Sequence, residues 1–179
     1  SGADVRRTLL ERLADLDRRA AAMADAARRE RPSRRFEHTL REFLPGEVAR
    51  VRDAVRGGQG EVHPGIARAV SVLAWVLDEI DTLMAQRRDP ELLAELGDAD
   101  RLADACYQPI VDFARAEGLP LTSGWPATQL SDFELSIWTG FIPTSIAPIF
   151  LPRDFFTRAV WWPALGHEIG HDFLASVRG

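Results

Sequence analysis

Apolar residues recur every three or four positions through the first two-thirds of the chain, which is the spacing of amphipathic α-helices. The first run extends from Asp4 to about Arg31 and ends before Pro32, which cannot continue a helix. Similar runs predict further helices over residues 33–44, 45–55, 64–83, 90–96 and 98–116. Between them, the Gly57-Gly58-Gln59-Gly60 segment indicates a loop. These helices could together form a bundle.

The pattern changes at Gly118. Residues 119–152 are rich in Pro, Thr, Ser, Trp and β-branched residues, and helical spacing is lost. Residues 133–138 alternate like a half-buried strand, and residues 145–151 suggest a second strand that Pro148 confines to an edge or an irregular segment. We therefore expect a mainly α protein, α+β overall, with a helical region over 1–118 and a small extended segment with a final helix over 119–179.

Composition and charge narrow the function classes. The 179 residues carry a net charge of −5, and the first 60 hold fourteen arginines against ten acidic residues. These arginines alternate with acids along helical faces, which is typical of solvated helices and argues against nucleic-acid binding. No apolar run approaches the ~20 residues that span a bilayer, and no signal peptide is recognisable. The compartment and the oligomeric state are not determined by these features.

The most informative pattern is His167-Glu168-Ile169-Gly170-His171, an HExxH motif. Two histidines four residues apart on a helix lie one turn apart on the same face, where both imidazoles can bind one zinc ion. A glutamate directly after the first histidine can act as general base toward a zinc-bound water. The alternative is that hydrogen bonds alone satisfy the two histidines.

The surrounding residues predict a helix that suits this role. Pro163 is placed where a first helical turn accepts proline, and nothing except two glycines interrupts the run to about Val177. Gly170 leaves room beside the histidines for a substrate or a neighbouring backbone. On a helical wheel, one face contains Ala164, His167, His171 and Leu174, and the opposite face contains Leu165, Ile169 and Asp172.

Residues 149–156 (IFLPRDFF), followed by 165–171 (LGHEIGH), resemble the entry to the catalytic helix of gluzincin-type zinc peptidases. Within these, they are distantly similar to the group related to the heat-shock peptidase HtpX. The resemblance covers about residues 145–175. It implies that His167 and His171 are zinc ligands, that Glu168 is the general base, and that the strand over 149–151 borders a cleft for a peptide or protein substrate.

In such families a third ligand, usually a glutamate, comes from a helix further downstream. Residues 172–179 contain no His, Glu or Cys, and Leu174 stands where the glycine of the metzincin pattern would be. We therefore expect a zinc peptidase segment truncated just after the motif, with a metal that is weakly bound or absent in this fragment.

Two other function classes remain open from the sequence. The chain could be a helical interaction module or pro-region with a vestigial motif, or the helix could hold a structural metal. Other possible ligands have simpler explanations: His63 as a loop residue, His38 as a surface residue, and Asp154 and Glu134 as solvated carboxylates or partners of arginine. The single cysteine, Cys106, excludes an internal disulfide and is expected to be packed within a helix.

Overall fold

The computed structural model describes residues 2–58, 62–119, 125–132, 136–137 and 146–178. They form a mainly helical protein with one small sheet, which confirms the predicted fold class. The chain divides into two compact units, an N-terminal unit over Ser1–Met84 and a C-terminal unit over Ala85–Gly179. Among the described residues, no helix combines the length and hydrophobicity needed to cross a membrane.

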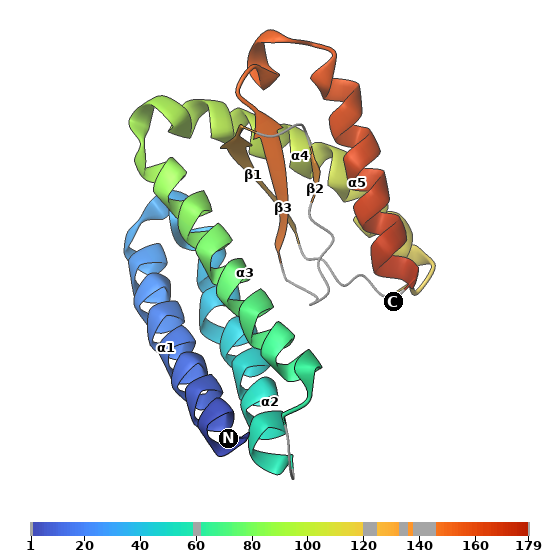
Figure 1. Ribbon diagram of the computed structural model, residues 1–179. Coiled ribbons are helices and arrows are strands. Elements are labelled where there is room, and N and C mark those ends of the chain that lie inside the picture. Colours follow the sequence, from blue (N-terminus) through green and yellow to red (C-terminus); the bar gives the residue numbers. More distant parts are fainter. Residues whose placement is uncertain (1, 59–61, 120–124, 133–135, 138–145, 179) are drawn as a thin grey trace. The chain divides into compact units, whose positions relative to one another are not determined.

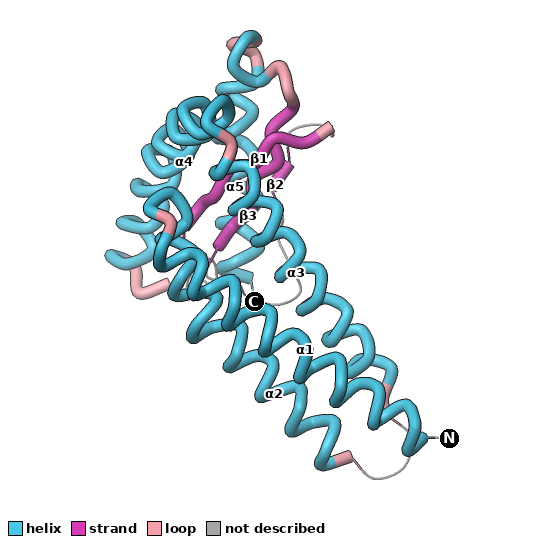
Figure 2. Tube along the Cα trace, turned by 90° about the vertical axis from the view of Figure 1, so that its left-hand side faces the viewer, coloured by secondary structure: helices cyan, strands magenta, loops and turns pink. Residues whose placement is uncertain are grey.

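The N-terminal unit is an arrangement of three long helices that run up, down and up (Figures 1 and 2). They are α1 (Gly2–Arg29), α2 (Leu44–Gly57) and most of α3 (Pro64–Arg88). Each helix buries the apolar stripe that its spacing predicted: Leu9, Leu13 and Leu16 on α1, Val48, Val51 and Val55 on α2, and Val70, Leu73, Leu77 and Ile80 on α3. The core of this unit is therefore largely aliphatic, with Phe36 as a buried aromatic side chain, and none of its described Arg, Asp or Glu residues is buried.

The link between α1 and α2 differs from the two separate helices predicted from Ser33 and Pro45. A 3₁₀ helix, η1 (Arg31–Phe36), is followed by a π-helical stretch, η2 (Thr39–Phe43), that leads directly into α2. Pro45 has no N–H to donate to a carbonyl one turn earlier. The wider π turn before it accommodates this missing hydrogen bond without ending the helix.

The C-terminal unit consists of a three-stranded sheet with two helices, α4 (Pro90–Ala116) and α5 (Trp161–Arg178). The strand order is β1 (Trp125–Ser131), β3 (Ile146–Pro152), β2 (Ser136–Ile137). β3 is central and pairs in parallel with β1, from Trp125 opposite Ile146 to Ser131 opposite Pro152. β2 pairs with β3 in the antiparallel sense, so the sheet is mixed.

Two expectations for this region were wrong. One helix, α4, covers both segments predicted at residues 90–96 and 98–116, because Gly97 and Asp98 are accepted within it. Asp89 caps this helix, since its carboxylate accepts the N–H of Glu91 at 2.9 Å. Residues 146–152 form the central strand, so Pro148 does not make this strand an edge.

The core of the C-terminal unit brings α4, the sheet and α5 together. It is a buried cluster to which α4 contributes three side chains, β3 two, the short 3₁₀ helix η3 (Phe155–Thr157) one, and α5 two. Its members are Ala99, Ala103, Tyr107, Ile149, Leu151, Phe155, Leu165 and Ile169. The motif helix is therefore fixed by its apolar side to the core of its own unit.

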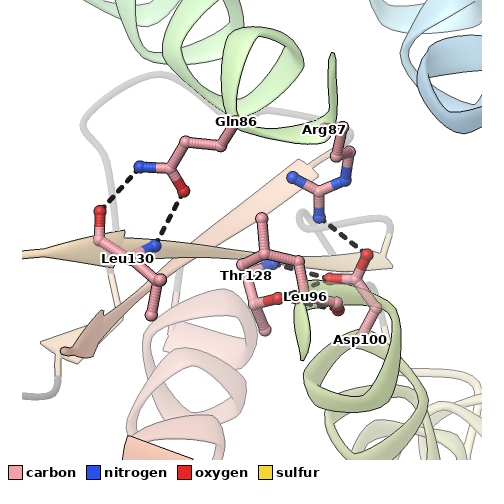
Figure 3. Close-up of polar contacts among 6 residues, drawn as sticks. All are labelled: Gln86, Arg87, Leu96, Asp100, Thr128 and Leu130. Atoms are coloured by element: carbon pink, nitrogen blue, oxygen red, sulfur yellow. Dashed lines mark hydrogen bonds and ion pairs between the residues drawn. The ribbon is translucent and has the colours of Figure 1, made fainter. Parts of the chain in front are cut away.

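The outer edge of β1 is closed by side chains rather than by another strand (Figure 3). Gln86 donates from Nε2 to the carbonyl of Leu130 at 2.8 Å and accepts the N–H of Leu130 at Oε1 at 2.9 Å. Asp100 accepts both the N–H and the hydroxyl of Thr128, at 2.8 and 2.7 Å, and also pairs with Arg87 at 2.6 Å. No described strand pairs with β1 on this side, so its buried peptide groups need other partners. These side-chain hydrogen bonds supply them.

The sequence and the structure divide the chain at different places. Composition changes at Gly118, which separates residues 1–118 from 119–179. The contacts separate Met84 from Ala85, within α3, because α4 packs on the sheet and on α5 and so joins the C-terminal unit. The last turn of α3, with Gln86 and Arg87, belongs to the same unit.

Candidate metal-binding site on helix α5

The HExxH motif lies in the middle of α5, as the sequence predicted. The helix begins two residues before Pro163, at Trp161. Asp154 organises this start, since its carboxylate accepts the Trp161 indole N–H at 3.1 Å and pairs with Arg158 at 2.8 Å. Its backbone carbonyl accepts the N–H groups of Thr157 and Arg158, so Asp154 is occupied by local structure.

The two faces predicted for this helix are confirmed where the structure describes them. Leu165 and Ile169 are fully buried in the core cluster, and the two histidine side chains are exposed. Leu174, expected on the histidine face, is 49% exposed. A helix with one buried apolar face holds its opposite face rigidly toward solvent, which suits a ligand-binding site.

His167 and His171 point their ring nitrogens at each other. Their Nε2 atoms are 3.0 Å apart, and the ring centroids are 4.5 Å apart with an interplanar angle of 89°. Without a metal, one Nε2–H donates to the lone pair of the other Nε2. Two imidazoles on one tetrahedral zinc, with bonds of about 2.0–2.1 Å, hold their ligating nitrogens about 3.3 Å apart. The observed separation is therefore within a few tenths of an ångström of that between two zinc ligands, and zinc binding also requires the donor ring to carry its proton on Nδ1 and both rings to turn their Nε2 lone pairs toward the metal.

Glu168 follows His167 directly and is half-buried. Its position on the helix is about 100° from His167, so it lies at the side of the exposed histidine face rather than in it. From this position the Glu168 carboxylate can contact a molecule that is bound at the two imidazoles, without coordinating a metal itself.

The helix also lies beside the sheet edge that is formed by β2. Residues of α5 and β2 are in contact, and β2 is the terminal strand on that side of the sheet (Figure 1). The strand over 149–151, which the resemblance places beside a substrate cleft, is the central strand of the sheet and is paired on both sides.

The other candidate ligands are accounted for separately. His63 accepts the N–H of Gly65 at Nδ1, at 3.1 Å, and so serves the start of α3. His38 pairs with Glu42 at 3.3 Å on the surface of the N-terminal unit. Cys106 is free and half-buried on α4, packed against the core cluster. Glu134 and the side chain of Asp172 lie outside the described part of the chain.

Within the described residues, no group of three or more His, Cys, Asp or Glu side chains is arranged to hold a metal ion. The structure thus brings together His167 and His171 and places Glu168 next to them. Sequence reasoning missed the polar cluster of Gln86, Arg87, Asp100 and Thr128. These residues come from three separate segments and form no motif, although two buried polar residues in β1 are a signal that such partners exist.

No protein-family model, no curated protein and no solved structure matches this chain.

Gly170 offers a test of how the exposed face of α5 is built. Gly170→Ala is expected to stabilise the protein by about 0.5–1 kcal/mol, because alanine restricts the unfolded chain and favours a helix interior. No atom lies within 4 Å of a Cβ built at this position. The measurement is the free energy of unfolding in urea.

Gly118→Ala is the matched control with the opposite sign. Gly118 ends α4 with a φ of 65°, a left-handed conformation that costs other residues about 1–2 kcal/mol. Equal destabilisation by both substitutions would show that the face around Gly170 is not open.

Proposed function

We propose that this protein is a zinc-dependent peptidase whose metal is held by His167 and His171 together with a third ligand that the described residues do not provide. The observation that carries the proposal is the pair of Nε2 atoms, 3.0 Å apart on an exposed helical face, with a glutamate next to the first histidine. A helix that carries a catalytic metal needs one apolar face buried in the core and its ligating imidazoles exposed to solvent, and α5 has both features. The residues present fit zinc by the chemistry of their donors, since neutral imidazoles are preferred zinc ligands.

Each motif residue has a defined role in this proposal. His167 and His171 donate their Nε2 lone pairs and keep both rings on one side of α5. When bound, zinc supplies a Lewis acid that acidifies water and polarises a peptide carbonyl. Glu168 accepts the proton of the attacking water and passes it to the leaving amine.

The sheet suggests how a substrate would lie. β1 has its outer edge filled by Gln86 and Asp100, so an added strand cannot pair there. β2 is the terminal strand at the other side, and no described residue pairs with its outer edge. An extended peptide that paired with β2 would run beside α5, because these two elements are in contact. The proposed substrate is therefore an extended peptide or protein segment.

The proposal is tested by zinc content and peptide cleavage measured on the same protein. Wild-type protein is expected to bind zinc and to hydrolyse an internally quenched peptide pool, to lose hydrolysis with a chelator, and to regain it when zinc is restored. His171→Ala is expected to weaken zinc binding by more than about 100-fold, since removal of groups that only support ligands already costs 10–100-fold.

His38→Ala is the matched control because it removes another exposed helical histidine. It is expected to leave zinc content and hydrolysis unchanged. Cleavage that survives chelation, or equal zinc loss in the two histidine variants, would contradict the proposal.

A further inference from the structure

One face of α5 carries the imidazole pair, contains no Asp, Glu or Arg, and is exposed except at Gly170, which is half-buried. We call it the histidine face, and between residues 162 and 174 it consists of Trp162, Pro163, Gly166, His167, Gly170, His171 and Leu174. Trp162 is 53% exposed and Leu174 is 49% exposed, one at each end. Because the face has no ionised carboxylate or guanidinium, two such faces can meet without repulsion between those groups.

The histidine face is complementary to itself in an antiparallel arrangement. Trp162, Gly166, Gly170 and Leu174 follow one another at four-residue spacing and form one ridge that is large at both ends and small in the middle. In a two-fold pair, Trp162 would lie opposite Leu174, and Gly166 opposite Gly170. No atom lies within 4 Å of a Cβ built on either glycine, so two backbones can approach closely there.

Zinc supplies the reason for two copies to meet. A closed zinc site is tetrahedral with four protein ligands, and His167 and His171 supply two from one chain. The same two residues of a second copy would supply the other two. We propose that the histidine face binds a second copy of this chain through one shared zinc ion, coordinated by His167 and His171 of both copies.

This inference rests on the metal-binding half of the proposed function and not on the peptidase half. One strip of one helix is far smaller than the roughly 1,600 Å² that stable interfaces bury, so the two copies associate only when zinc is bound. Four imidazoles leave no open position for water. The zinc-linked pair is therefore a resting form that hydrolyses no peptide, and release of the second copy opens the site.

The test is the mass of the whole protein in solution as zinc is added after stripping with a chelator. Light scattering coupled to gel filtration is expected to show the 19.9 kDa chain without zinc and twice that mass at one zinc per two chains. Chelation is expected to restore the single chain, and His171→Ala is expected to prevent the pair from forming.

Leu174→Arg probes the face without touching a ligand. It is expected to raise the dissociation constant of the zinc-linked pair about tenfold or more, because at each end of the pair it replaces the apolar contact between Leu174 and Trp162 with a guanidinium that loses its hydration. Leu93→Arg is the matched control, since Leu93 is an exposed leucine on α4 with 38% exposure, and it is expected to leave the pair intact. Glu168→Gln is also expected to keep the pair, because Glu168 is not a ligand.

The outcomes separate the two proposals. A zinc-loaded single chain at every zinc ratio overturns the shared site, whether or not that chain cleaves peptides. Pairs that persist in chelator, or in His171→Ala, also overturn it. A zinc-linked pair with no hydrolysis at any zinc ratio supports the shared site and overturns the peptidase. Absence of zinc binding overturns both.

Discussion

Asp100→Asn is expected to destabilise the C-terminal unit by about 3–5 kcal/mol, because it removes the charge that neutralises a buried guanidinium. Arg87 and Asp100 have side chains that are only 3% and 10% exposed, and their contact is 2.6 Å. Asparagine retains an acceptor for Thr128 but removes the negative charge that contacts the Arg87 guanidinium. The measurement is unfolding in urea followed by tryptophan fluorescence, since four of the five tryptophans lie in residues 85–179.

Asp98→Asn is the matched control, two residues earlier on the same helix. Asp98 pairs with Arg101, and both side chains are largely exposed, at 66% and 75%. Exposed ion pairs contribute about 0–1 kcal/mol, so this substitution is expected to change stability little. A cost for Asp100→Asn no larger than that for Asp98→Asn would show that the buried cluster does not stabilise the unit.

Glu168→Gln is expected to reduce the turnover number for peptide hydrolysis by about 10²–10⁴-fold while zinc content stays unchanged. The amide has nearly the same shape as the carboxylate but cannot accept a proton from water. Glu168 is half-buried beside the two histidines and occupies neither ligand position. The measurement is the turnover number, together with zinc per chain, on the same preparation.

Glu168→Asp is the control that separates the need for a carboxylate from the need for its exact position. It keeps the carboxylate but withdraws it by one methylene, so a partial loss of turnover between those of wild type and glutamine is expected. If Glu168→Gln loses zinc in proportion to activity, Glu168 supports the metal site rather than the proton transfer. If it retains full activity, another group is the base.

Much of the fold could be predicted from the sequence, because long amphipathic helices carry their own signal. The stripes of α1, α2 and α3 and the two faces of α5 follow from the spacing of apolar residues alone. β1 was not predicted. Its buried residues include Thr128 and Gln129, so its burial does not alternate, and buried polar groups become tolerable only when distant partners such as Asp100 are known.

Of the candidate site, only the three motif residues could be predicted from the sequence. His167, Glu168 and His171 are linked by helical geometry, which fixes their mutual positions whatever the rest of the chain does. The element beside them could not be deduced in the same way. The sequence suggested the strand over 149–151, but pairing decides which strand is central, and it places β3 between its neighbours and β2 beside α5.

The closed edge of β1 determines where this protein can be cut for separate study. A fragment that begins at Gly118, where the composition changes, would lose Gln86 and Asp100 and leave the peptide groups of Thr128 and Leu130 bare. An exposed strand edge recruits strands from other molecules, so such a fragment would aggregate even with its motif helix intact. Dissection of the motif segment therefore has to start upstream of Gln86, inside α3.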